Sequence, residues 1–253
     1  MVSAVDTKEI KEKIRMRIWD LLERTNVALF PRPVYHRIPN FVGAEVAASK
    51  LASLDIFKKA KVVKVNPDSP QRYVRYLALL QNKVVVMPTP RIRDGFIVLD
   101  PSRIPRSRIS EASTIAGSYR YGSMVKPWML PKVDLIVIGS VAVNNRGARL
   151  GKGEGYAEIE YAILRMLCRV SEETYVVTTV HDLQIIEDAI PVEPYDVNVD
   201  VIVTPSRIIH INPRLPKPKG IIWDLLPKEK IRKIPILNEL KNMLKSVKDI
   251  SCT

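Results

Sequence analysis

VDLIVIGSVAVNNRGARLGKGEGYAEIEYAILRMLCRV (Val133–Val170) contains the clearest alternation of strand and helix signals in the chain. Its first part, Val133–Val143, is almost wholly apolar and predicts a buried strand. Its last part, Gly155–Val170, repeats apolar residues at helical spacing and predicts a helix. Between them, Arg149–Glu160 places three glycines among basic and acidic residues. The stretch therefore predicts a strand and a helix joined by a glycine-rich, charged loop.

The alternation of strands and helices continues on both sides of this stretch. The predicted helices are Thr7–Arg24, Val42–Leu54 and Gln71–Leu80, and the predicted strands are Lys61–Val65, Lys83–Pro88, Thr174–Val180, Val199–Thr204 and its possible partner Arg207–Ile211. Strands separated by helices favour an α/β fold, with a parallel or mostly parallel sheet covered on both faces. Signals are weak from Phe96 to about Leu130. No linker stands out, so we expect one domain over residues 1–253, ending in a basic tail at 217–253.

Composition narrows the class of protein and of ligand. The 253 residues carry a formal net charge of +13, which attracts polyanions such as nucleic acid or phosphorylated small molecules. The bases are spread along the chain, which weakens the nucleic-acid interpretation. No apolar run is long enough for a membrane span, and no signal core is present, so we expect a cytoplasmic protein. Cys168 and Cys252 are expected to be free thiols in a reducing compartment.

The glycine-rich loop suits a phosphate group. Ligands of open α/β sheets settle at the carboxyl ends of strands, and a helix N-terminus there offers unpaired N–H groups. Glycines at 151, 153 and 155 let the backbone come close to a phosphate, and Arg149 and Lys152 supply charged donors. Glu158 and Glu160 in the first helical turn could hold Mg²⁺. The loop matches neither the Walker nor the dinucleotide pattern. The alternative is a glycine turn with solvated charges.

Other candidate residues depend on less specific signals. Lys11 and Arg15 lie one helical turn apart and could clamp a polyanion, or could simply form a basic helix face. His181 follows a predicted strand and is a candidate catalytic base. Asp196 and Asp200 flank the start of a strand, and we interpret Asp200 as a turn acid.

Several stretches together resemble the 5-formyltetrahydrofolate cyclo-ligase family, also called methenyltetrahydrofolate synthetases. GARLGKGEGYAEIEYA is similar to that family's GxRLGxGxGYYDR loop, and IPVEPYDVNVDVIVTP is similar to its later segment. FPRPVYHRIPNFVGA, VNPDSPQRYVR and PTPRIRDG resemble, in the same order, the branch of methenyltetrahydrofolate synthetase domain-containing proteins. Animal members of that branch carry an added RNA-recognition domain, which we do not expect here.

The resemblance implies an activity and a set of site residues. It implies ATP- and Mg²⁺-dependent conversion of 5-formyltetrahydrofolate, or a related reduced formyl pterin, to the 5,10-methenyl form. It also implies a three-layer α/β sandwich akin to the ribose-phosphate isomerase and CoA-transferase group. The implied catalytic residues are Lys152 and Arg149. The implied ATP phosphate-binding residues are Lys11, Arg15, Gly151, Gly153, Gly155 and Tyr156. The implied metal ligands are Glu158 and Asp196, and Asp68 is the implied substrate contact.

The chain also departs from the family pattern. Ala157 and Ile159 replace an aromatic and a basic residue, and Tyr195 replaces a histidine. Phosphate binding is therefore expected to carry over better than folate binding. Two other interpretations stay open: nucleotide or RNA binding on the same scaffold without cyclisation, and sugar-phosphate isomerase or acyl-transfer chemistry through Glu154 or Glu193.

Overall fold

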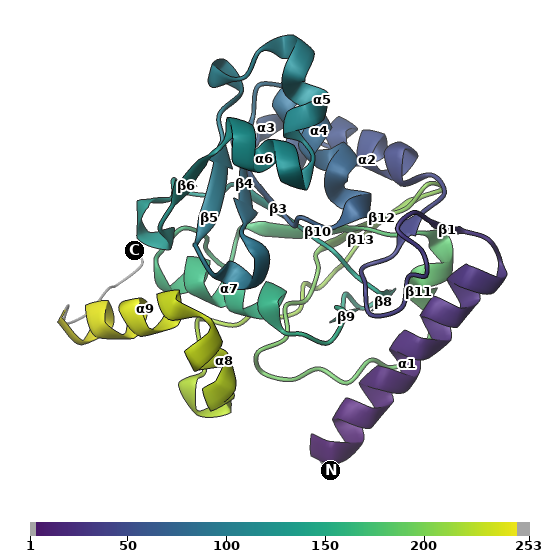
Figure 1. Cartoon of the computed structure of the whole chain (residues 1–253). Coiled ribbons are helices and arrows are strands. Elements are labelled where there is room, and N and C mark those ends of the chain that lie inside the picture. The colour runs from purple at the N-terminus through teal and green to yellow at the C-terminus, as the bar shows by residue number, and fades with distance from the viewer. Residues whose placement is uncertain (1–3, 247–253) are drawn as a thin grey trace.

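Leu135–Ile138 (β7) lies in the middle of the main sheet of a computed structural model that describes residues 4–246 (Figure 1). Within those residues the main sheet has eight strands in the order β13-β12-β10-β7-β3-β4-β5-β6. Their bounds are β3 Val62–Val65, β4 Val84–Pro88, β5 Phe96–Leu99, β6 Ser123–Val125, β10 Tyr175–Thr179, β12 Val201–Val203 and β13 Ile208–His210. The pairs from β4 through β3, β7 and β10 to β12 are parallel, and β5, β6 and β13 add antiparallel edges.

Helices cover both faces of this sheet. The helices are α1 Ala4–Arg24, α2 Ala44–Ser53, α3 Asp55–Lys59, α4 Arg72–Leu80, α5 Ile109–Ala112, α6 Ile115–Tyr121, α7 Tyr156–Met166, α8 Lys228–Lys233 and α9 Pro235–Ser246. Leu135 and Val137 of β7 point into the core beneath α2, α3, α4 and α5. Ile136 and Ile138 point into the core beneath α7 and α9. Side chains that alternate along one buried strand thus pack into two hydrophobic cores, one on each face of the sheet. The predicted three-layer α/β arrangement is confirmed.

Helix α1 packs against a second, smaller sheet. Its buried Ile14, Ile18 and Trp19 contact the sheet β11-β8-β9, formed by Ile185–Ile186, Ala142–Asn144 and Arg149–Leu150. A two-stranded pair, β1 Ala28–Leu29 and β2 Asn40–Phe41, lies next along the chain. The α1 cluster places the N-terminal helix beside the segment that leads into the glycine-rich loop.

The predicted strand Val133–Val143 is divided in the structure. β7 ends at Ile138, and the chain turns through Gly139–Val141 before β8 joins the smaller sheet. Gly139 is tightly enclosed, because a Cβ there would lie 2.9 Å from the Ile38 side chain. The prediction was wrong about continuity because apolar residues fill both sheets. The helix predicted to Val170 ends at Met166, and the weakly patterned region from Phe96 forms β5, α5, α6 and β6.

The predicted basic tail is largely part of the fold. Lys217 forms an ion pair of 2.8 Å with Asp200, and both side chains are only 1% exposed. Asp200 is thus a buried partner of a lysine, and its interpretation as a turn acid was wrong. Ile234, Ile236 and Leu237 lie fully buried in the core beneath α7. Residues 247–253 of the predicted tail lie outside the described part of the chain.

Cys168 is disulfide-bonded, so the expectation of a free thiol there was wrong. Cys252 lies outside the described residues. None of the helices within residues 4–246 has both the length and the apolar composition needed to cross a membrane.

Candidate active site

The candidate site lies where the order of strands in the main sheet changes direction. β4 lies on one side of β3, and β7, which comes later in the chain, lies on the other. In such sheets ligands bind in the crevice at the carboxyl ends of these strands. Here those ends are followed by Asp68 and Gly139. A Cβ on Gly139 would lie 3.1 Å from Oδ2 of Asp68, so the absence of a side chain lets this carboxylate stand at the crevice.

The loop Gly151–Gly155 joins β9 to the N-terminus of α7. Gly153 has φ +96° and Gly155 has φ +72°, a left-handed backbone that glycine adopts without strain. Within the described chain, the backbone N–H groups from Gly151 through Glu158 donate no hydrogen bond to protein groups. A run of unpaired N–H groups at a helix N-terminus forms a concavity suited to an anion. The predicted phosphate-binding glycines are thus brought together in one turn.

Two of the predicted bases border this loop. Arg15 of α1 donates from Nε to the Gly151 carbonyl oxygen at 2.8 Å and forms an ion pair with Glu12 at 2.8 Å. Lys152 forms an ion pair with Glu154 at 2.9 Å and keeps 35% of its side chain exposed. Burial raises the pKa of Asp68, while the charge of Lys152 is the largest of the effects that lower it. Lys152 therefore lies close enough to influence Asp68 across the crevice.

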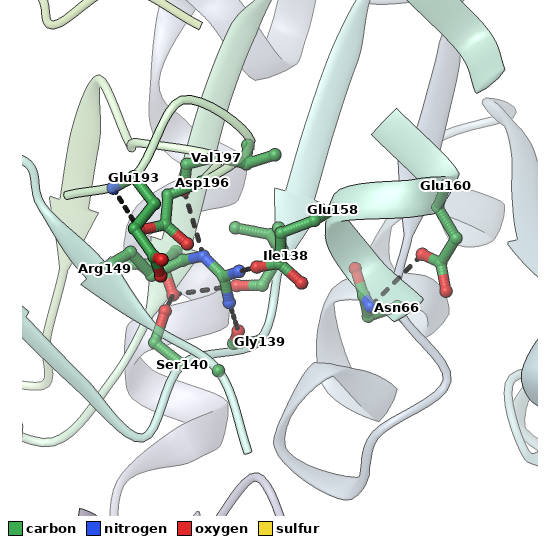
Figure 2. A network of polar contacts seen from close by, with 12 residues as sticks. Asn66, Ile138, Gly139, Ser140, Arg149, Glu158, Glu160, Glu193, Asp196 and Val197 are labelled. Atoms are coloured by element: carbon green, nitrogen blue, oxygen red, sulfur yellow. Dashed lines mark hydrogen bonds and ion pairs between the residues drawn. The ribbon is translucent and has the colours of Figure 1, made fainter. Parts of the chain in front are cut away.

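Arg149 is almost fully buried and reaches three separate parts of the chain (Figure 2). It donates from Nη1 to the Gly139 carbonyl oxygen at 2.7 Å and from Nε to the Val197 carbonyl oxygen at 3.1 Å, and it pairs with Glu158 through Nη2. These contacts tie the end of β7, the segment before β12 and the first turn of α7 together. In this arrangement Arg149 orients its neighbours, and its assignment as a catalytic residue stays a prediction.

Acidic residues lie beside the loop and are partnered by bases. Lys11 of α1 forms ion pairs with Glu193 and Asp196, both at 2.6 Å. Burial raises the pKa of Asp196, and the nearby charge of Glu158 raises it further. The two predicted metal ligands, Glu158 and Asp196, are therefore close enough for their charges to interact. The described part of the chain contains no cluster of three or more His, Cys, Asp or Glu residues arranged to hold a metal ion. A Mg²⁺ ion here would need phosphate oxygens and water to complete its ligands.

Beneath the crevice lies a buried polar network that was not predicted. Lys64 of β3 forms an ion pair of 2.5 Å with Glu160 of α7 and a hydrogen bond of 2.9 Å with Asn66. Figure 2 shows Glu160 turned toward Asn66, whereas Glu158 reaches toward Arg149. A role for Glu160 in holding Mg²⁺ stays a prediction, and in this structure its carboxylate is paired with Lys64. A lysine within the apolar strand KVVKV was the signal that a buried acidic partner exists.

The crevice is also supported by a fully buried arginine. Arg75 of α4 donates from Nη1 to the carbonyl oxygens of Asn66 at 2.5 Å and of Asp68 at 3.2 Å. Burial lowers the pKa of Arg75 to about 10, and the charge of Asp68 opposes this shift. Arg75 thus orients the backbone that carries Asp68. Its position in the predicted helix Gln71–Leu80 gave no sign of this role.

His181 has a structural role at the end of β10. It caps the short 3-10 helix Asp182–Gln184, and its Nδ1 accepts a hydrogen bond from the Leu183 N–H at 3.2 Å. Its ring lies edge-on to Phe41, with centroids 6.1 Å apart. The role of His181 as a catalytic base stays a prediction, and its geometry is that of a helix cap.

The comparisons with known proteins agree with this geometry. A model of the 5-formyltetrahydrofolate cyclo-ligase family matches residues 7–205. The methenyltetrahydrofolate synthase domain-containing protein of Danio rerio is 42% identical over 247 residues, covering 96% of this chain and 64% of that protein. Its namesake from Homo sapiens is 43% identical over 236 residues, covering 91% of this chain and 61% of that protein. The chain thus spans less than two thirds of the length of these relatives.

A solved structure with a similar fold is the NMR structure of Aquifex aeolicus 5,10-methenyltetrahydrofolate synthetase. It has a TM-score of 0.51 and 21% sequence identity, covering 80% of this chain and 93% of that one. At this identity the likeness concerns the fold alone. The family match, by contrast, spans most of the chain, and it includes the glycine-rich loop and both strand ends of the crevice. The chain belongs to the 5-formyltetrahydrofolate cyclo-ligase family.

Proposed function

We propose that this chain catalyses the ATP- and Mg²⁺-dependent cyclisation of 5-formyltetrahydrofolate, or a related formyl pterin, to the 5,10-methenyl form. The observation that carries the proposal is the run of unpaired N–H groups from Gly151 through Glu158 at the sheet crevice. Membership of the cyclo-ligase family supplies the reaction class. The remaining support comes from the fit of a triphosphate, a divalent ion and a pterin to the residues around this loop.

A triphosphate fits the charge and shape of the loop. The N–H groups would donate to phosphate oxygens, and the N-terminus of α7 adds a partial positive charge. Lys152 is the nearest base with substantial exposure, and its partner Glu154 is itself 45% exposed, so this ion pair is weakly held. Lys152 can therefore turn from Glu154 to a phosphate. Arg15 holds the Gly151 carbonyl oxygen and would keep the loop in shape.

The carboxylates of Glu158 and Asp196 could bind Mg²⁺ only if phosphate oxygens complete its coordination. Mg²⁺ usually takes one or two carboxylates, substrate phosphates and several waters. Glu158 and Asp196 would supply those carboxylates, and each is already paired with a base, Arg149 and Lys11. Bound Mg²⁺ would neutralise phosphate charge, and the two bases would stay as counter-charges that keep the pair of acids in place.

The proposed reaction transfers the γ-phosphoryl group of ATP to the formyl oxygen. ADP leaves in this step. N10 then attacks the activated carbon and loses its proton to solvent, and phosphate leaves with the formyl oxygen. Phosphoryl transfer depends on positioning and charge neutralisation more than on covalent participation of the protein. Lys152 would stabilise the charge on the transferring group, while Arg149 would hold Glu158 and the end of β7 in register.

Asp68 is proposed to contact the pterin at the crevice. Its carboxylate stands beside Gly139, and its backbone is held by Arg75. Two of the departures from the family pattern, Ile159 and Tyr195, contact other residues of this chain. Ile159 is only 7% exposed and packs in the core beneath α7, where a charged side chain would not fit. Tyr195 lies with its ring centroid 5.8 Å from Nζ of Lys11.

An absorbance assay at the methenyl-pterin band tests the proposal. Purified protein, MgATP and 5-formyltetrahydrofolate should produce a band that grows only when ATP and Mg²⁺ are both present. A flat trace combined with measurable ATP binding would instead favour the second candidate, nucleotide or RNA binding without cyclisation. The net charge of +13 is the observation that favours that candidate.

A further inference from the structure

Lys230 of α8 contacts the glycine-rich loop from a distant part of the chain. Its Nζ donates a short hydrogen bond to the carbonyl oxygen of Glu154. The same Nζ lies 3.6 Å from the centroid of the Tyr156 ring, which is a cation–π contact. Helix α8 lies outside residues 7–205, the part of the chain that the family model matches. A lysine from outside the segment that the family model matches therefore contacts the loop to which we assign phosphate binding.

The contact determines which way one peptide unit of the loop faces. In a trans peptide the C=O and the following N–H point to opposite sides. Because Lys230 holds the Glu154 oxygen, the N–H of Gly155 is turned away from α8. That N–H is one of those that donate no hydrogen bond within the described chain. A Cβ at Gly155 would meet no atom within 4 Å, so packing does not hold this point of the loop.

Lys230 is carried by an element that is itself anchored. α8 leads directly into α9, where Ile236 and Leu237 are fully buried. Glu239 of α9 forms an ion pair of 2.7 Å with Lys126, next to β6. The position of Lys230 is thus set by the core beneath α7 and does not depend on the loop.

Charges of both signs surround the Lys230 ammonium. Burial lowers the pKa of Lys230, the charge of Glu154 opposes this shift, and the nearby charges of Lys233 and Arg91 add to the lowering. Arg91 has φ +57°, a left-handed backbone in a segment that packs near α7. Like charges brought together beside an anion-binding loop are stabilised when an anion occupies it.

We propose that Lys230 is a positioning residue of the ATP site, which the C-terminal segment supplies to the glycine-rich loop. Its ammonium group binds the Glu154 carbonyl oxygen and the face of the Tyr156 ring. These two contacts keep the Gly155 N–H directed at the triphosphate. This inference rests on the proposed function of the loop.

The test compares Lys230→Met with three other forms of the full chain. Lys230→Met keeps the length of the side chain and removes the ammonium. Lys230→Arg restores a cation that can donate to the carbonyl oxygen and stack on the ring. Lys228→Met removes the same charge from an exposed position of the same helix. We expect calorimetric titration with MgATP to give about tenfold weaker binding for Lys230→Met, and binding within about twofold of wild type for the other two.

A second measurement separates this inference from the proposed function. The ¹⁵N heteronuclear NOE of Gly153 and Gly155, recorded without nucleotide, should fall in Lys230→Met and be unchanged in Lys228→Met. If wild-type protein binds no MgATP, the proposed function is rejected, and a fall in this NOE still establishes that Lys230 orders the loop. An unchanged NOE, or unchanged MgATP affinity in Lys230→Met beside a wild type that binds, would overturn the inference.

Discussion

Lys152 and Arg149 are three positions apart and differ sharply in their surroundings. The Arg149 side chain is 1% exposed and is taken up by protein oxygens, whereas the Lys152 side chain is 35% exposed and has an exposed partner. The base that remains available to a ligand is therefore Lys152. The charged pattern of the loop identifies both residues as candidates for ligand binding. Only the fold shows that Arg149 holds other parts of the chain in place, whereas Lys152 remains available to bind a ligand.

Replacing Lys152 with alanine should weaken binding of ATP about 10- to 100-fold, because a hydrogen bond to a charged group contributes about 1.5–3 kcal/mol. The free energy of unfolding should stay nearly unchanged, since the Lys152–Glu154 pair is exposed. Calorimetric titration with MgATP checks the first expectation. Lys61→Ala, an exposed lysine at the opposite end of β3, is the control. Equal affinity in both variants would show that Lys152 does not contact the nucleotide.

Residues of the candidate site could be grouped from the sequence where the signal is local. The glycines, Lys152 and Glu158 lie in one short segment, and the structure brings them together in one turn. Partners far apart in sequence were not predictable. The pairing of Lys11 with Glu193 and of Lys64 with Glu160 depends on how α1 and α7 pack, which no short pattern records.

At the scale of elements, β3 and α7 are joined by a buried ion pair. Lys64 and Glu160 are 2% and 6% exposed at the side chain. Removing one partner leaves an uncompensated buried charge, so Lys64→Met should lower the free energy of unfolding by about 3–5 kcal/mol. Chemical denaturation measures this difference.

A matched control for the buried pair is the exposed pair Lys13–Glu9, whose side chains are 73% and 60% exposed. Lys13→Met should change the free energy of unfolding by less than about 1 kcal/mol. The double variant Lys64→Met, Glu160→Leu should recover much of the loss, because no charge is then left buried. A small effect of Lys64→Met alone would mean that the pair is hydrated in solution.

The cap of the 3-10 helix Asp182–Gln184 should make stability depend on pH. Burial lowers the pKa of His181 below its usual 6.5, and Asp182 opposes this shift. The unfolded chain therefore binds a proton more readily, and stability falls as pH drops through 6.5 toward the lowered pKa. The loss should reach up to about 1 kcal/mol, the usual contribution of a cap. His181→Asn, which can cap without titrating, should flatten the change in unfolding midpoint between pH 7.5 and 5.5, roughly the window where histidine titrates. An equal slope in wild type and variant would contradict this assignment.

Periodicity located the long helices and the central strands of the main sheet, and the misses have physical causes. The predicted strand Val133–Val143 spans two strands because its apolar residues face different sheets. β5, α5, α6 and β6 lie in a region where short elements and many polar residues leave little periodic signal. Short helices bury few residues, so their pattern is easily lost.

At the scale of the whole molecule, the C-terminal segment belongs to the core. Leu237 is fully buried with residues of α7, so Leu237→Ala should lower the free energy of unfolding by about 2–5 kcal/mol. Leu225→Ala, at a leucine that is 52% exposed, should cost less than about 0.5 kcal/mol. Equal, small effects in chemical denaturation would mean that this segment does not belong to the core.

The central claim is that the chain activates a formyl oxygen by phosphorylation at the glycine-rich loop. The most direct measurement uses 5-formyltetrahydrofolate labelled with ¹⁸O in the formyl group, incubated with the protein and MgATP. Phosphorylation of that oxygen predicts that each phosphate released carries one ¹⁸O atom, in step with growth of the methenyl band. Unlabelled phosphate, or no phosphate from a protein that binds both substrates, would contradict the account.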